Sequence, residues 1–590
     1  MNTGRFGFRS CTLSAVVAPG GAGAGGAVSD AEADIVLYNG NILTVDREFS
    51  VAEAAGIRNG VFLAVGKERE VLKLAGPKTR DINLAGKTVV PGFTDGHAHM
   101  DREGLKFLYP SLAGARSIAD ILKIVESEVE KSKPGEWVVT MPVGDPPFYQ
   151  NVPGILKENR LPTRWELDTV SPNNPVYIRG IWGFWNRPPI VSVANSQALR
   201  LAHITRDTQP PYDGVTIHRD PGTGEPTGVF SEANFVPVVE FSLMKVVPRF
   251  THELRLKALE DSQKRYNAAG TTSIYEGHGV ASEVVRVYKE LWARGVLTVR
   301  SYLVMSPTPD VSAPDFEIML RDWATAADGA GIGDSMLKTG GLFIQAGGNT
   351  SIARLLNAEA PYTAWGAYYY DALSRDRFRD FAFAAAKYGM RVNTIASDQV
   401  SLDAALETFE EIDRLHSIAG SRWVVEHLAQ ATPKNIETMK RLGIVPTVIP
   451  ATSVWKNGAA RLNQTPEEAR EWDTPYRSLI DGGLPLVLGT DNVPPEPFFT
   501  LWVTLTREDR DSGDVLGPAQ KLSREDALRT MTINGAHLSF EERLKGSIER
   551  GKYADLVVIR ENYLTIPEDQ IKDIRPVMTM VGGKIVYQRD

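Results

Sequence analysis

Two histidines separated by a single residue carry the clearest chemistry in this chain of 590 residues. They are His97 and His99, in the segment PGFTDGHAHM at 91–100, which the apolar residues Val89 and Val90 precede. This pattern predicts a buried strand, on which residues i and i+2 project to the same face. The two imidazoles would then lie side by side at the end of the strand and chelate one metal ion. Two ligands do not complete a metal site, so a pair of solvated loop histidines is the alternative.

Two more chemically active side chains end apolar runs further along the chain. His427 closes RWVVEH at 422–427, and Asp491 closes PLVLGTD at 485–491. The second run predicts a strand that is buried on both faces. A carboxylate at such a place needs a cation or hydrogen-bond donors, which makes Asp491 a candidate metal ligand. A single histidine at a strand end is by itself more typical of a structural role.

Glu276 and His278 also follow a β-rich run, in IYEGHG at 274–279. They are expected to face the same site as the other strand-end residues. We interpret His278 as an additional ligand or proton shuttle, with a hydrogen-bonded loop histidine as the alternative. Arg507 could pair with an anionic substrate group, although a salt bridge on a helix surface is the more ordinary role. The other histidines lie in helical or loop contexts and are taken as structural: His203, His218, His252, His416 and His537.

Composition excludes several classes of protein. A net charge of -8 without a basic block makes nucleic acid a poor candidate partner. The one cysteine, Cys11, rules out a disulfide framework and a cysteine-based zinc site, so a metal must rest on histidine, carboxylate and water. No apolar stretch reaches the roughly 18 residues that span a bilayer, so we expect no membrane protein. The chain is long enough to divide into a major and a minor domain.

Helical and β-rich segments alternate as a parallel α/β barrel requires. Helical periodicity is present at 117–131, 251–268, 374–388, 403–416 and 432–442. Each of the last four is followed by a β-rich run, namely TTSIYE, RVNTIA, RWVVEH and IVPTVI. The carboxyl ends of such strands are where a (β/α)8 barrel holds its ligands. Between about 140 and 250 the alternation gives way to a Trp-, Pro- and Asn-rich insertion.

Several segments together resemble one known family. They are ADIVLYNGNILTV at 33–45, VANSQAL at 193–199, GEPTGVF at 224–230, AAGTTSIYEG at 268–277, VVEHLAQ at 424–430, VLGTDNVPPEPF at 487–498 and GSIERGKYADLVVI at 546–559. With the histidine pair, their order resembles the amidohydrolase superfamily, in particular its YtcJ-like branch (amidohydrolase family 3) of metal-dependent hydrolases. The resemblance implies a TIM-like (β/α)8 barrel at 91–540 and a small β-sandwich domain from 34–90 and 541–590. Residues 1–33 are expected to be a disordered or weakly signal-like tail.

The resemblance also implies roles for site residues. His97, His99 and Asp491 match metal ligands, and Asp491 also matches the group that takes a proton from the attacking water. His427 matches either a metal ligand or a group that polarises the substrate. Glu276 lies near a common family aspartate, whereas no family role fixes His278.

Two departures from the family pattern argue against a binuclear centre. Phe343 stands where binuclear relatives have a bridging lysine, and Gly347 stands where an aspartate is common, while Lys338 lies five residues too early. Asn393 replaces a histidine ligand and is a poor ligand for zinc, although it remains a possible additional site residue. We therefore expect a single divalent ion per chain, zinc, held by His97, His99, Asp491 and His427.

The expected activity is hydrolysis of a C–N bond, in an amide or cyclic amide of a small organic molecule. The aromatic segments 181–185 and 361–370 suggest an apolar or aromatic substrate, although they could equally serve structural packing. Alternatives are another reaction on the same fold (deaminase, lactonase or esterase, hydratase, decarboxylase) and a non-catalytic scaffold. We expect a cytoplasmic homodimer or higher homo-oligomer, with export by the N-terminal tail as the alternative location.

Overall fold

The structure is a computed structural model that describes residues 32–182, 185–234, 236–307, 311–325, 330–357, 365 and 372–589. The expected N-terminal tail lies, up to residue 31, outside the described residues. So do residues 183–184 and, apart from Trp365, the aromatic segment 361–370. Within the described chain, no helix combines the length and the apolar character needed to cross a membrane.

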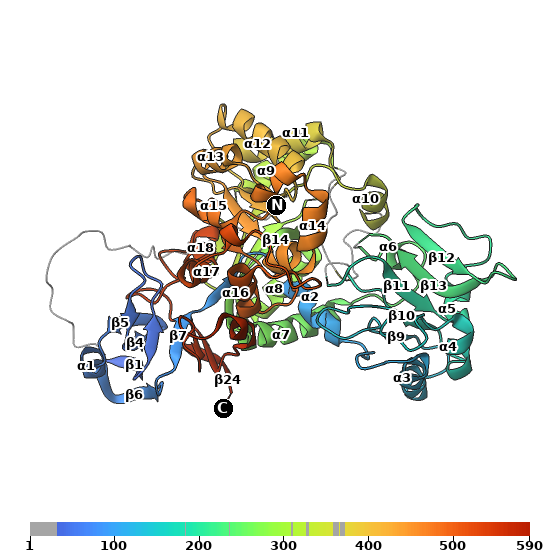
Figure 1. The fold of residues 1–590 in the computed structure, drawn as a ribbon, viewed down its shortest axis with the longest axis horizontal. Coiled ribbons are helices and arrows are strands. Elements are labelled where there is room, and N and C mark those ends of the chain that lie inside the picture. Colours follow the sequence, from blue (N-terminus) through green and yellow to red (C-terminus); the bar gives the residue numbers. More distant parts are fainter. Residues whose placement is uncertain are drawn as a thin grey trace, which may run out of the picture.

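Eight parallel strands form the centre of the molecule (Figure 1). In sheet order they are β8 (Phe93–Asp95), β14 (Thr271–Val280), β15 (Arg300–Met305), β17 (Leu337–Phe343), β18 (Val392–Ile395), β19 (Val424–Glu426), β20 (Val445–Val448) and β21 (Val487–Leu488). The ring is closed between its first and last strands, where the backbone N–H of Gly96 donates to the carbonyl of Leu488 at 3.0 Å. The predicted (β/α)8 barrel is therefore confirmed.

Polar caps set the starts of the barrel helices. α7 (His252–Ala268), α11 (Arg375–Lys387), α12 (Gln399–Asp413) and α13 (Pro433–Leu442) each follow a Ser, Thr or Asp whose side chain accepts a backbone N–H of the first turn. Three of these helices match the predicted ranges closely. The fourth, α12, begins four residues before the predicted start at 403, because Asp398 and Ser401 form a reciprocal capping box.

Further helices follow the barrel strands. They are α2 (Met100–Glu103), α8 (Ser282–Ala293), α9 (Ala313–Ala324), α10 (Thr350–Asn357), α14 (Gly458–Gln464), α15 (Tyr476–Asp481), α16 (Pro497–Thr506), α17 (Arg524–Thr530) and α18 (Ile533–Leu538). After β20 the chain makes a π-helical turn at Ala451–Lys456, a rare geometry that is often found at functional sites.

Both ends of the described chain build a pair of small sheets beside the barrel (Figure 1). One sheet has the order β5 (Val61–Gly66), β4 (Ala54–Arg58), β1 (Ala33–Tyr38), β6 (Ala75–Asn83). The other has the order β24 (Lys584–Gln588), β23 (Met578–Val581), β22 (Leu556–Ile559), β7 (Thr88–Pro91), β2 (Asn41–Leu43), β3 (Val51–Ala52). Side chains of both sheets share one hydrophobic core, as in a β-sandwich.

A separate lobe rises from the barrel between β8 and β14 (Figure 1). Its sheet runs β12 (Val215–Arg219), β13 (Pro226–Glu232), β11 (Ile190–Ala194), β10 (Val176–Ile178), β9 (Val138–Thr140). Helices α3 (Ile118–Glu130), α4 (Arg164–Val170), α5 (Ser196–Leu201) and α6 (Val238–Phe241) accompany it. The core of the lobe joins Ile121 and Val125 of α3 to Val138 and Val176 of the sheet. Helical periodicity at 117–131 therefore marks a helix of the lobe rather than of the barrel.

Candidate metal centre

The histidine pair lies just beyond its strand rather than on it. Strand β8 ends at Asp95, and His97 and His99 occupy the loop that leads into α2. Their rings nevertheless meet edge to face, with centroids 5.1 Å apart, and both side chains are buried. The prediction of a strand-borne pair is wrong in this detail, because the loop rather than the pleat brings the rings together.

The carboxylate of Asp95 fixes this loop against the last barrel strand. It accepts the backbone N–H groups of His97 at 3.2 Å and of Thr490 at 2.9 Å, and also the Thr490 hydroxyl at 2.5 Å. Burial raises the pKa of Asp95 to about 7. Sequence analysis missed Asp95, although it stands inside the histidine motif.

Asn492 fixes the backbone of the second histidine. Its side-chain oxygen accepts the backbone N–H of His99 at 3.2 Å and the hydroxyl of Tyr266 at 2.6 Å. Its side-chain NH₂ donates to the carbonyl of His99 at 2.6 Å. Asn492 therefore ties the loop after β8 to the loop after β21.

His427 and Asp491 reach the same point from the ends of β19 and β21. The Nε2 atoms of His427 and His97 are 3.1 Å apart, and Asp491 Oδ1 is 3.1 Å from His99 Nε2. The second oxygen of Asp491 is 4.0 Å from His427 Nε2. Both residues have left-handed backbones, with φ of 53° and 51°. Such strain costs about 1–3 kcal/mol per residue and is concentrated at functional sites.

His278 belongs to this cluster as well. Its ring centroid, on β14, lies 4.8 Å from that of His97, 5.0 Å from that of His99 and 5.4 Å from that of His427. Among the described residues, three sets of ligand atoms lie within 4.8 Å of one another and could each hold an ion, namely His97–His99–His278, His97–His427–Asp491 and His99–Asp101–Glu276. The structure thus brings all the main predicted ligands and His278 together.

Two carboxylates stand behind the histidines. Glu276 Oε2 is 3.6 Å from His99 Nδ1, while its other oxygen accepts the hydroxyl of Tyr288 at 2.6 Å. Glu426 Oε2 is 3.5 Å from His97 Nδ1. Carboxylates in this position orient ligating imidazoles and raise their basicity. Sequence analysis placed Glu276 near the site but missed Glu426, which directly precedes His427.

Arg102 adds a feature that sequence analysis also missed. Its guanidinium lies 2.7 Å from His99 Nδ1, and because a guanidinium only donates, His99 accepts at this atom. The proton of the neutral ring is then on Nε2, facing Asp491. A metal ion at Nε2 would require the other neutral tautomer, with the proton on Nδ1, and Arg102 would then have to give up its contact with that atom.

Protonation states and donor atoms fit a divalent cation. Burial lowers the pKa values of His97, His99, His278 and His427, which favours neutral rings. The positive charge of Arg102 adds to this effect at the first three, whereas the Asp491 carboxylate partly offsets it at His427. Neutral imidazole is the metal-binding form. In the described part of the chain, Asp491 Oδ2 and both Glu426 oxygens are buried without a hydrogen-bond partner. Nitrogen and carboxylate donors of this kind suit zinc and related ions.

The positions that depart from the binuclear pattern are occupied by other contacts. The ring of Phe343 packs against His278 with centroids 5.2 Å apart. Asn393 accepts the hydroxyl of Tyr275 at 2.6 Å and donates to the carbonyl of Leu342 at 3.3 Å. Lys338 pairs with Glu541 at 2.9 Å, away from the cluster. Gly347, for its part, has a left-handed backbone with φ of 77°.

The remaining candidates lie elsewhere. The five histidines taken as structural are not in the cluster; His252, for example, pairs with Glu290 at 2.6 Å. Arg507 is buried rather than on a helix surface, and it donates to the carbonyls of Leu516 and Thr474. It therefore holds backbone in place, and the surface salt bridge predicted for it is wrong.

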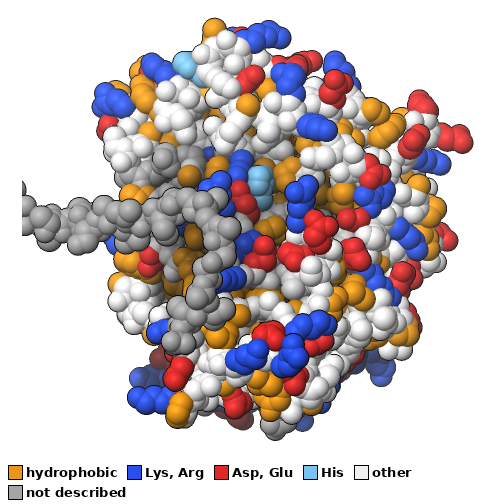
Figure 2. Space-filling view, turned by 90° about the vertical axis from the view of Figure 1, so that its left-hand side faces the viewer, with side chains coloured by type: hydrophobic (Ala, Val, Ile, Leu, Met, Phe, Trp, Pro, Cys, Tyr) orange, Lys and Arg blue, Asp and Glu red, His pale blue; other side chains and the backbone are white. Residues whose placement is uncertain are grey.

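The cluster opens to solvent on one side. Figure 2 shows a histidine side chain in a hollow of the surface, between basic and acidic side chains. The side chain of His427 is 11 % exposed, against 0 % for His97 and 5 % for His99. Lys456, at the end of the π-helical turn, is buried near this opening, and burial lowers its pKa to about 7. Its charge acts on both Asp491 and His427.

Comparison with known proteins identifies the family. The model of the amidohydrolase family matches residues 80–587. The chain belongs to the amidohydrolase family. The YtcJ-like resemblance is thereby confirmed, and the protein is a hydrolase of a metal-dependent family.

Individual relatives span nearly the whole chain. The N-substituted formamide deformylase of Arthrobacter pascens is 26% identical over 568 residues, covering 94% of this chain and 98% of the relative. The putative amidohydrolase YtcJ of Bacillus subtilis is 23% identical and covers 94% and 99%. A metal-dependent hydrolase from Pyrococcus horikoshii has a similar structure, with a TM-score of 0.66, 21% identity and coverage of 91% and 99%. This last likeness supports the fold.

Proposed function

We propose that the protein hydrolyses a C–N bond in an amide or cyclic amide of a small organic molecule, with one divalent metal ion, zinc, per chain. One observation carries the proposal. His97, His99, His427 and Asp491, from three distant segments, converge with donor atoms about 3–4 Å apart at the carboxyl ends of the barrel strands. This is where TIM barrels hold their reactive groups.

The metal ion would rest on these four residues, with His278 as the additional candidate. When bound, it supplies Lewis acidity, which lowers the pKa of water and polarises a carbonyl group. The Glu426 carboxylate, 3.5 Å from His97 Nδ1, would orient the ring of His97 from behind, whereas Arg102 donates to Nδ1 of His99.

Asp491 is the residue suited to move the proton. Its Oδ2 is buried and lacks a hydrogen-bond partner among the described residues, and burial raises the pKa of the carboxyl group. It would accept a proton from the attacking water at this oxygen and later pass it to the leaving nitrogen. His427, at the open side of the cluster, would stabilise the developing oxyanion if it is not itself a ligand.

The bond type is supported by relatives rather than by the site alone. The Arthrobacter relative is named for deformylation of an N-substituted formamide, which breaks a C–N bond. At 26% identity, substrates differ readily between relatives, so we propose the bond class and leave the acyl and amine parts open.

The test is a hydrolysis screen with purified protein. Formamides, other amides, cyclic amides, lactones and aryl carboxylates are incubated with wild type and with Asp491→Asn, each with and without added zinc. We expect metal-dependent release of amine from at least one amide, absent in the variant. If lactones are hydrolysed and amides are not, the result would support ester hydrolysis instead of C–N hydrolysis. If no compound reacts with a protein that carries metal, the amide proposal is wrong.

A further inference from the structure

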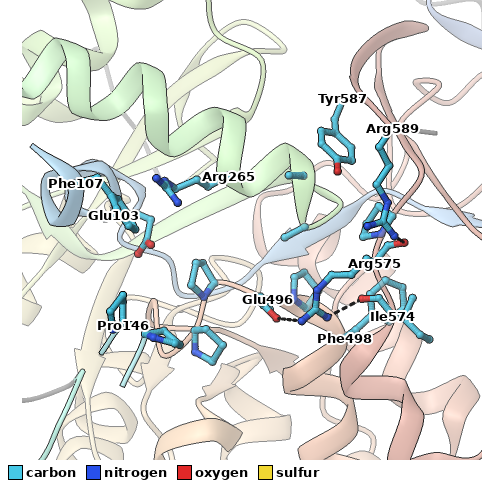
Figure 3. Close-up of a pocket in the computed structure, with 17 residues that line it drawn as sticks. Glu103, Phe107, Pro146, Arg265, Glu496, Phe498, Ile574, Arg575, Tyr587 and Arg589 are labelled. Carbon is cyan, nitrogen blue, oxygen red and sulfur yellow. Dashed lines mark hydrogen bonds and ion pairs between the residues drawn. The ribbon is translucent and has the colours of Figure 1, made fainter. Parts of the chain in front are cut away.

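A second cavity lies away from the metal centre, with a volume of about 460 Å³ (Figure 3). It is bounded by the carboxyl end of α7, the segment before and at the start of α16, and the C-terminal segment around β24. Its volume is within the range of small-molecule sites, about 300–1,000 Å³. No step of the proposed hydrolysis uses it.

The charged groups in its wall favour an anion. Arg265, Arg575 and Arg589 line it, against the two carboxylates Glu103 and Glu496. Both carboxylates are already paired: Glu496 is 3.3 Å from the guanidinium of Arg575, and Glu103 is 2.7 Å from Lys106 outside the cavity. Among the described residues, Arg265 and Arg589 form no salt bridge, and Arg589 donates to the backbone carbonyl of Arg575 at 2.9 Å.

The neutral part of the wall is flat and apolar. It includes Phe107, which is 42% exposed, Tyr587, and prolines at 146, 147, 494, 495, 497 and 576. The guanidinium of Arg265 lies over the ring of Phe107, 3.3 Å from its centroid. Figure 3 shows Arg265 on one side, beside Phe107 and Glu103, and on the other side Arg589 next to Tyr587 with Arg575 below them. A ligand with a planar body and one negative end would match this arrangement.

We propose that this cavity is a second small-molecule site, which binds a small aromatic monocarboxylate. The carboxylate would pair with Arg575 and Arg589, since guanidinium groups bind carboxylates through charge-assisted hydrogen bonds. The aromatic body would lie against Tyr587 and the prolines, towards Phe107.

Contacts inside the protein connect this cavity to the metal centre. Lys106, which pairs with Glu103, also donates to the carbonyl of Asn492 at 3.3 Å. Asn492 in turn holds the backbone of His99 through two hydrogen bonds. The chain also runs directly from the ligand Asp491 to the prolines at 494 and 495 in the cavity wall. Occupancy of the cavity is therefore expected to change the affinity of the metal centre, a consequence that rests on the proposed function.

Binding is tested by calorimetric titration of the full chain with 2-naphthoate, with its neutral amide 2-naphthamide, and with inorganic phosphate. We expect one naphthoate per chain, with at least about tenfold weaker binding of both other probes. Arg589→Ala should weaken naphthoate binding about tenfold or more, and Arg575→Lys less than Arg575→Ala. Arg321→Ala, an exposed arginine on α9, is the matched control and should leave binding unchanged.

Several results would overturn the proposal. They are no naphthoate binding at millimolar concentration, equal binding of the amide or of phosphate, and undiminished binding in Arg589→Ala, which would place the ligand elsewhere. The metal link is measured separately, as zinc affinity in competition with a chelating dye. Naphthoate should shift it severalfold in wild type and not in Arg589→Ala. An unchanged zinc affinity would refute the link, whereas a protein that binds naphthoate but no zinc would refute the metal centre and not the cavity.

Discussion

Replacing Gly277 with alanine would disturb the contact between His97, a proposed metal ligand, and the carboxylate behind it. Gly277 lies in β14, where a Cβ atom would meet Glu426 Oε1 at 2.6 Å and His97 Nδ1 at 2.8 Å. Both distances are shorter than real Cβ contacts, and both neighbours are fully buried, so they cannot simply turn into solvent. The imidazole of His97 or the Glu426 carboxylate must shift.

The size of the effect follows from the cost of overpacking. Inserting a methyl group into a packed interior typically costs about 1–3 kcal/mol. If most of this cost falls on the orientation of His97, the affinity for metal should fall about 5- to 150-fold, since each 1.4 kcal/mol is a factor of ten. If the overpacking cost instead destabilises the fold of the barrel, the unfolding free energy of the metal-free protein should fall by about 1–3 kcal/mol.

Zinc affinity and thermal unfolding of the metal-free protein together measure this cost. Gly420→Ala is the matched control, because a Cβ atom there meets nothing within 4 Å. We expect weaker zinc binding or a lower Tm in Gly277→Ala only. Wild-type zinc affinity and wild-type Tm in Gly277→Ala would refute the packing of Glu426 against His97.

Three further predictions concern single side chains. Asp491→Asn keeps the volume but removes the proton acceptor, so kcat on a hydrolysed amide should fall about hundredfold or more while KM changes less; near wild-type turnover would place the base elsewhere. His278→Ala should lower metal occupancy, activity or both, whereas His203→Ala should change neither; full occupancy and activity in the first variant would return His278 to a structural role. Because burial lowers the pKa of Lys456 from 10.5 to about 7, the unfolded chain binds a proton that the folded chain lacks between these values, so this residue makes stability rise with pH there. Lys456→Met should flatten that rise in unfolding free energies measured from pH 7 to 10, and an unchanged slope would contradict the shift.

The residues that carry chemistry could be predicted because a parallel barrel gathers its strand ends. His97, His427 and Asp491 each follow an apolar run. Because His278 follows a β-rich run, it was predicted to lie at the same end of the barrel. The residues that hold them could not be predicted in this way. Asn492 and His99 are 393 positions apart, and only the closing of β8 against β21 brings them into contact.

Local patterns also left some assignments open. The apolar run from Val89 and Val90 suggested that the strand continues through His97 and His99, but the backbone N–H of His97 donates to the side chain of Asp95 rather than to a neighbouring strand. Helical periodicity at 117–131 gives the helix but not the sheet against which it packs. Likewise, the charge of Arg507 suggested the surface, whereas backbone carbonyls satisfy its guanidinium in the interior.

Metal content of the purified full chain is the most direct test of the central claim, that four converging side chains form a single-ion centre. We predict, by elemental analysis after dialysis against metal-free buffer, close to one divalent ion per chain in wild type and clearly less in Asp491→Asn, which loses a charged ligand. Two tightly bound ions per chain, or none after exposure to zinc, would contradict the account.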